Sequence, residues 1–87
     1  MDLRRFLQLS SKRERAEVAE GCASSVSYLY QLAGKHRYAS ALLATRIEKS
    51  THEVALRSDG RLGAVSRESL VRYPEIFAKV DELGDEP

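Results

Sequence analysis

The strongest constraint on the fold is a succession of short segments, each opened by a residue that can cap a helix. These capping residues are Asp2, Ser11, Ser25 and Ser40, and apolar residues recur three or four positions apart after each of them. A side-chain oxygen at such a position accepts a hydrogen bond from a free N–H group of the first helical turn. Glu14 follows Ser11 by three residues, which is the spacing of a reciprocal capping box. The sequence therefore predicts helices over about residues 3–9, 12–22 and 25–33, and a further one that begins after Ser40.

Two further features refine the predicted helices: the residue that ends the third and the apolar face of the fourth. Gly34 follows the third segment and is expected to end that helix with a positive φ, which glycine tolerates. In the fourth segment Leu43 and Ile47, supported by Leu42, are expected to form the face that packs on the core.

The periodicity changes after this fourth segment. Val54 and Leu56 alternate with polar residues, Asp59-Gly60 follows, and Leu62 and Val65 continue the apolar pattern. An Asp-Gly pair between alternating runs favours a tight turn, so we expect a β-hairpin over about residues 53–65. A C-terminal helical segment over 66–83, capped by Ser66, completes the predicted architecture, and the last four residues are expected to be frayed.

The length and composition limit the class of protein. A chain of 87 residues forms one domain over 1–87, and 43% hydrophobic with 31% charged residues is a globular balance. Cys22 is the single cysteine, which excludes an internal disulfide framework and a cysteine-rich zinc site. No apolar run approaches the roughly 20 residues of a membrane span, and no signal peptide is evident. We expect a cytoplasmic protein.

The charge is unevenly distributed along the chain. The net charge is +1, but residues 1–50 carry nine Lys and Arg against five Asp and Glu, whereas residues 51–87 carry five against eight. A basic half suggests a surface for a polyanion, and an acidic half suggests a surface with a different role.

The position of the turn between the second and third segments decides which residues face the core. In a DNA-binding helix-turn-helix unit, the residue four before the turn is small and those six and nine after it are apolar. A turn at Gly21 would place Glu17 at the small site and bury Ser27 and Tyr30, which would cost about 1 to 3 kcal/mol for each unpaired polar group. A turn at Ala23 instead places Ala19 at the small site and Leu29 and Leu32 in the core. The sequence therefore predicts the turn at Ala23 and a helix-turn-helix unit over residues 15–34, although an alanine with positive φ would be strained by about 1 kcal/mol.

This unit is followed by the stretches "GKHRYASALLATRIEKST" and "AVSRESLVRYPEIF". Together they resemble the Cro/CI-type helix-turn-helix superfamily, especially the YdaS-like group of prophage regulators. The resemblance covers residues 11–77, and the chain differs by an insertion at residues 52–63. It implies a mainly α, lambda-repressor-like domain of four to five helices, here with the hairpin as an appendage near the C-terminus. It also implies a sequence-specific regulator of transcription, most simply a repressor, that acts on double-stranded DNA and associates with the nucleoid when bound.

The predicted reading face lies on the third helix. Base readout is assigned to Ser25, Val26, Ser27, Tyr30 and Gln31, and Gln31 is suited to a bidentate contact with adenine. The alternative is a solvated helix face, with Val26 at the edge of the core and Tyr30 covering the helix end.

Basic residues flank that helix in the sequence. Arg13 and Arg15 stand near the start of the second helix, and Lys35, His36 and Arg37 follow the third. These side chains are expected to contact DNA phosphates, which would make binding weaken steeply with salt.

The resemblance also implies a homodimer on a near-palindromic operator. A two-stranded hairpin leaves open edges, so Val54, Leu56, Leu62 and Val65 are the expected dimer contacts. A hairpin that only packs on the helices is the alternative.

No residue pattern indicates catalysis. His36 and His52 lack a carboxylate or cysteine constellation, and Cys22 fits a buried core position. We expect no enzyme activity, no cofactor and no metal. The alternative function is an antitoxin-like or other protein–protein interaction module built on the same helices.

Overall fold

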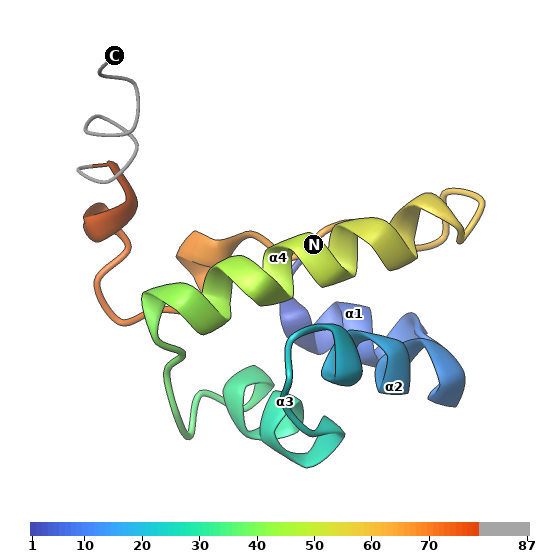
Figure 1. The fold of residues 1–87 in the computed structure, drawn as a ribbon, viewed down its shortest axis with the longest axis horizontal. Coiled ribbons are helices and arrows are strands. Elements are labelled where there is room, and N and C mark those ends of the chain that lie inside the picture. Colours follow the sequence, from blue (N-terminus) through green and yellow to red (C-terminus); the bar gives the residue numbers. More distant parts are fainter. Residues whose placement is uncertain (79–87) are drawn as a thin grey trace.

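The structure, a computed structural model, describes residues 1–78. Its elements in chain order are α1 (Leu3–Leu9), α2 (Lys12–Gly21), α3 (Val26–Ala33), α4 (Ala41–Leu56) and the 3-10 helix η1 (Arg67–Ser69). Residues 75–78 are also helical. Figure 1 shows α4 lying across α1 and α2, with α3 on the opposite side of these two helices.

Local hydrogen bonds set where the α-helices begin. Four predicted caps, one at the start of each α-helix from α1 to α4, accept a hydrogen bond from the backbone N–H three residues later, at 2.7 to 3.1 Å: Asp2, Ser11, Ser25 and Ser40. The capping box is complete, because the Ser11 N–H also donates to Glu14 Oε1 at 2.7 Å. The predicted helix starts are therefore confirmed, and α2 ends at Gly21, one residue earlier than expected.

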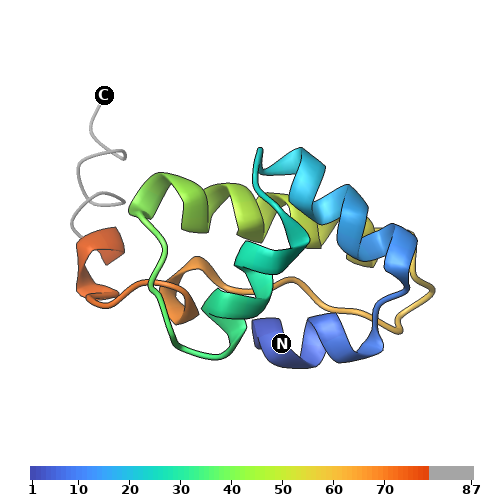
Figure 2. The same ribbon diagram turned by 90° about the horizontal axis from the view of Figure 1, so that it is seen from below.

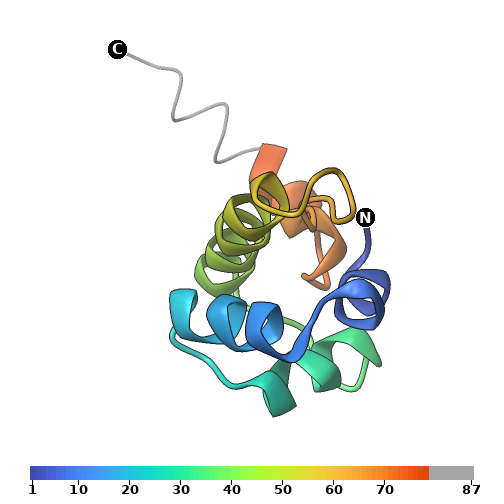
Figure 3. The same ribbon diagram turned by 90° about the vertical axis from the view of Figure 1, so that its right-hand side faces the viewer.

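The helices enclose one core. Helix α4 packs on α2 and η1, while α3 packs on α1 and α2; the view along α4 in Figure 3 shows these helices arranged around a common interior. The largest fully buried side chains come from all four α-helices, from the end of α2 and from the segment after α4: Phe6, Leu7, Val18, Cys22, Leu29, Ile47, Thr51 and Val65. The prediction of a mainly helical domain is confirmed for residues 1–78.

The buried face of α4 includes Ile47, as expected, and Leu43 packs against it half-buried, but Leu42 does not belong to it. Ala44, Ile47, Thr51 and Val54 are buried, in the three- and four-residue spacing of one helical face. Leu42, expected to support this face, is 61% exposed, so that prediction is wrong. It lies two residues before Ala44, a separation that places it on the other side of the helix.

The β-hairpin prediction is wrong, because α4 continues to Leu56 and residues 53–65 contain no strand. Val54 belongs to the buried helical face, whereas Leu56 lies on the opposite side, 72% exposed. Asp59 and Gly60 do form a turn with positive φ values of 55° and 81°, as the Asp-Gly pair predicts. The turn joins a helix to an extended segment instead of joining two strands.

The extended segment after this turn packs beneath α4. In Figure 2 it runs back along the molecule between α4 and α1. Leu62 and Val65 are buried, and the Val65 N–H donates to Thr51 Oγ1 at 3.0 Å. Three of the expected dimer contacts, Val54, Leu62 and Val65, are thus core residues of the single chain, and among the four only Leu56 is exposed. The predicted hairpin interface does not exist.

The segment after residue 65 forms one 3-10 turn before the helical residues 75–78. Ser66 lies at the start of η1 but its hydroxyl makes no capping hydrogen bond, contrary to expectation. The Arg67 guanidinium lies 4.3 Å from the centroid of the buried Phe77 ring. The rest of the predicted segment 66–83, from residue 79, and the frayed end lie outside the described residues. Within residues 1–78, no helix combines the length and apolar character that crossing a membrane requires.

Candidate nucleic-acid interface

The connection between α2 and α3 is a Schellman turn. The Ser24 N–H donates to the Ala19 carbonyl at 2.8 Å, and the Ala23 N–H donates to the Glu20 carbonyl at 3.1 Å. In this motif the residue after the C-cap adopts the left-handed conformation. That residue is Ala23, with φ 55°, and Cys22 is the C-cap.

The register predicted for this turn is confirmed. Ala19, Leu29 and Leu32 are all at most 5% exposed, and Tyr30 is 49% exposed. A turn at Gly21 would have required Tyr30 to face the core. The small side chain of Ala19 lets α2 and α3 approach, and the two leucines anchor the inner face of α3.

The outer face of α3 carries most of the predicted readers. Ser27 and Tyr30 are exposed, and Gln31 is half-buried beside them. Ser25 is exposed, but its hydroxyl caps α3 by accepting a hydrogen bond from the Tyr28 N–H at 3.1 Å. Val26 is half-buried and packs against the core, which was the alternative interpretation of that residue. The structure therefore gathers Ser27, Tyr30 and Gln31 on one surface.

A second Schellman turn ends α3. The His36 N–H donates to the Gln31 carbonyl and the Lys35 N–H to the Leu32 carbonyl, both at 3.1 Å. The left-handed residue is Lys35, with φ 63°, whereas Gly34 has φ −82°, so the predicted positive φ at Gly34 is wrong by one position. Gly34 is the C-cap, and a Cβ there would lie 2.9 Å from His36 Cδ2. The glycine accommodates the histidine ring.

This turn places the basic residues after α3. Arg37 folds back so that its Nε–H donates to Gln31 Oε1 at 2.9 Å. Lys35 Nζ donates to the Ser69 carbonyl at 3.1 Å, which ties the loop to η1. Lys35, His36 and Arg37 are all exposed after the C-terminal end of α3, but Lys35 is held at η1 and Arg37 at Gln31.

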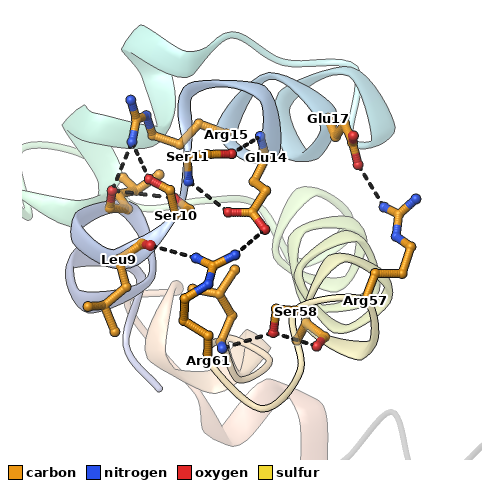
Figure 4. Close-up of polar contacts among 12 residues, drawn as sticks. Leu9, Ser10, Ser11, Glu14, Arg15, Glu17, Arg57, Ser58 and Arg61 are labelled. Atoms are coloured by element: carbon orange, nitrogen blue, oxygen red, sulfur yellow. Dashed lines mark hydrogen bonds and ion pairs between the residues drawn. The ribbon is translucent and has the colours of Figure 1, made fainter.

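The two arginines of α2 lie in different surroundings. Arg15 Nη1 donates to the carbonyls of Ser10 at 2.6 Å and Leu7 at 3.4 Å, where it caps the end of α1 (Figure 4). Arg13 is exposed and lines a groove between α2 and α4 with Glu17 and Arg57. Neither arginine joins the basic residues after α3.

Arg46 on α4 is a candidate that sequence reasoning missed. It is exposed and stands one helical turn before Ser50, the residue on which Gly21 packs, so it lies near the end of α2. Burial dominates at Cys22 and raises the pKa of the thiol. No local pattern identifies Arg46, because its position depends on how α4 crosses α2.

An ionic network links α2 to the end of α4 and to the segment that follows it. Arg61, from the segment after α4, donates to the Leu9 carbonyl at 2.7 Å and to Glu14 Oε2 at 2.6 Å (Figure 4). The hydrogen bond from Arg61, and then that from the Ser11 N–H, lower the pKa of the Glu14 carboxyl. Arg57 pairs with Glu17 at 2.7 Å, a second link between the end of α4 and α2.

In the described part of the chain, no group of three or more His, Cys, Asp or Glu side chains is placed to hold a metal ion. Comparisons of the chain with protein-family models, with curated protein sequences and with solved structures find no match. Inference about function therefore depends on the residues and geometry described above.

Proposed function

We propose that this protein is a sequence-specific double-stranded DNA-binding regulator of transcription, most simply a repressor, that inserts α3 into the major groove. The observation that carries the proposal is the α2–turn–α3 unit. Its turn at Ala23 directs Leu29 and Leu32 inward and leaves Ser27, Tyr30 and Gln31 outward.

The dimensions and chemistry of α3 suit this role. An α-helix with its side chains is about 10–12 Å in diameter, and the major groove of B-DNA is about 12 Å wide. The outward residues carry hydroxyl and carboxamide groups, which can donate to and accept from base edges. An aliphatic face in the same place would favour a protein partner.

Cationic groups stand at both ends of the proposed reading helix. Arg46 lies on α4 near the end of α2, before the turn that precedes α3, and Lys35 follows α3. This spacing supports contacts with phosphates on either side of the groove, which orient a reader without specifying sequence. Arg15 contributes by stabilising the junction of α1 and α2, and is not among these contacts.

The resemblance to Cro/CI-type regulators suggests two copies on a near-palindromic site. Two reading helices would then lie about one helical turn of DNA apart, roughly 34 to 36 Å. The residues of the rejected hairpin do not supply this interface, because three of the four are buried in the single chain.

A protein–protein interaction module is the second candidate. It is favoured by large apolar side chains that are exposed outside α3, which are Met1, Tyr38, Leu42, Leu56, Tyr73 and Ile76. Such a module would not require duplex DNA.

The two candidates differ in salt-dependent duplex binding. The protein, shown to be folded by circular dichroism, is titrated against a pool of random duplexes at about 50 and 200 mM salt. We expect binding that weakens steeply with salt, and selection from the pool should return a preferred sequence. Folded protein that binds no duplex at either salt concentration would contradict the proposed function as a DNA-binding regulator.

Two tyrosine variants localise the binding surface. Tyr30→Ala on α3 should weaken binding to the selected duplex, whereas Tyr73→Ala should not, although the wild-type residues are exposed to similar extents, 49% and 59%. Equal losses in the two variants would argue against α3 as the reading helix.

A further inference from the structure

Gln31 and Arg37 form a side-chain pair on the surface of α3. The pair is possible because the chain reverses at Lys35, where φ is 63°, and returns Arg37 to the outer face of the helix. The Arg37 Nε–H donates to Gln31 Oε1 at 2.9 Å. Among residues 1–78, no other group bonds to the Arg37 guanidinium.

This hydrogen bond determines which edge of Arg37 is available. A guanidinium has one N–H on Nε and two on each Nη, in a fixed plane. With Nε bound to Gln31, the edge formed by Nη1 and Nη2 faces away from the pair. Two parallel N–H groups on this edge match the adjacent O6 and N7 acceptors that guanine presents in the major groove.

The anchor on α3 distinguishes a base contact from a phosphate contact. Phosphate oxygens also accept from such an edge, but Arg37 is held by a residue that shares the outer face of α3 with Ser27 and Tyr30. Lys35, in contrast, is tied to the Ser69 carbonyl, away from that face. Of these two cations, only Arg37 is anchored to the helix proposed to enter the groove.

We infer that Arg37 reads a guanine and that Gln31 is a positioning residue that orients the Arg37 guanidinium. The inference rests on the proposed function. It reverses the roles expected from the sequence, in which Gln31 reads adenine and Arg37 contacts phosphate. A bidentate contact with adenine uses both Oε1 and Nε2 of glutamine, and here the hydrogen bond from Arg37 takes one lone pair of Oε1 and turns the carboxamide toward the guanidinium.

The test measures affinity for the selected duplex and for duplexes in which one guanine is replaced by each other base. Arg37→Lys keeps the charge but lacks the planar fork, and Gln31→Ala removes the acceptor. Both should reduce the preference for guanine at the same base pair by roughly tenfold to a hundredfold. The double variant should lose little more than either single variant, because the two residues act as one unit.

Gln31→Glu separates positioning from reading. Glutamate keeps an acceptor for Arg37 but has no N–H group to donate to adenine. We expect this variant to keep the guanine preference, with weaker binding to all duplexes because of the added negative charge. Arg72→Lys, on the exposed segment after η1, is the matched control and should leave all these quantities unchanged.

Thermal unfolding establishes that each variant is folded. Independent losses at two different base pairs, or an unaltered guanine preference in Arg37→Lys, would overturn the inference while duplex binding stands. Wild-type duplex binding without base preference would overturn both the inference and the sequence specificity of the proposed function, and would leave only non-specific duplex binding. An absence of duplex binding by the wild type would overturn both the inference and the proposed function.

Discussion

A Cβ atom at Gly21 would lie 2.7 Å from Oγ of Ser50, so α2 packs on α4 at a point where only a residue without a side chain fits. Ser50 is 7% exposed, and a Cβ at position 21 would force its hydroxyl to turn away. The conspicuous glycine at the end of α2 therefore serves the contact between two helices, and the turn is made two residues later at Ala23.

Gly21→Ala should destabilise the fold despite alanine's better helix propensity. Overpacking costs about 1 to 3 kcal/mol, whereas the propensity gain is at most about 1 kcal/mol. Urea denaturation of Gly21→Ala in the wild-type and Ser50→Ala backgrounds measures this difference. The loss should be smaller in the second background, which lacks the clashing oxygen, and a stabilising Gly21→Ala in the wild type would contradict the close contact.

Ala23→Gly should stabilise the fold. Ala23 has φ 55°, a conformation that is strained for alanine and not for glycine. After the entropy gained by the unfolded chain is subtracted, a net gain of up to about 1 kcal/mol is expected. The control is Ala16→Gly at an exposed position inside α2, which should lose about 1 kcal/mol. Losses of the same size at the two positions would exclude the left-handed turn at Ala23.

Thr51→Val should weaken the packing of the segment that follows the Asp59-Gly60 turn against α4. Thr51 Oγ1 accepts a hydrogen bond from the buried Val65 N–H at 3.0 Å, and valine leaves that donor unpaired. The expected loss is about 1 to 3 kcal/mol. Amide hydrogen exchange at Val65 gives the specific readout: protection should fall in Thr51→Val and persist in Thr51→Ser, which keeps the hydroxyl. Unchanged protection in Thr51→Val would mean that Val65 has another partner.

Glu14 should make stability depend on pH in the acid range. Its pKa is lowered in the folded state, chiefly by the hydrogen bond from Arg61, so the unfolded chain takes up a proton first as the pH falls. The stabilisation is present above the unfolded pKa, about 4.3, and is lost as the pH falls through the lowered folded pKa. The difference in unfolding free energy between wild type and Glu14→Gln should therefore shrink on acidification.

NMR titration of the Glu14 carboxyl tests the cause of this shift. Arg61→Gln should raise the pKa of Glu14 toward its ordinary value, because Arg61 supplies the largest lowering effect. Arg57→Gln is the matched control, since Arg57 pairs with Glu17. An equal response to both variants would assign the effect to overall charge and not to the hydrogen bond.

Local chemistry was sufficient to predict some features of the candidate interface. Ser25 and its partner Tyr28 are three residues apart, so the start of α3 depends on neighbours in the chain. The register of the α2–α3 turn followed from the cost of burying polar side chains, which excludes Gly21 whatever lies on the other side of the core. The pair formed by Gln31 and Arg37 was not predicted, because it depends on the left-handed conformation at Lys35.

The errors arise where distant residues decide the structure. Val54 and Leu56 alternate in sequence, but Val54 lies on the same helical face as Ile47 and Thr51, and contacts along this face extend α4 over the positions expected to be a strand. Leu62 and Val65 then fill the core of the single chain instead of a subunit interface. Periodicity over a few residues cannot distinguish these outcomes, since a short apolar run suits either a strand or a buried helix.

The sequence by itself determined where the helices begin and which side of α3 faces inward, because capping hydrogen bonds and the burial of Leu29 and Leu32 depend on residues a few positions apart. Only the tertiary structure decided the length of α4, the position of Arg46 near the end of α2 and the hydrogen bonds of Arg15 at the end of α1. These features depend on contacts between segments far apart in the chain, and such contacts form only when the whole core is assembled.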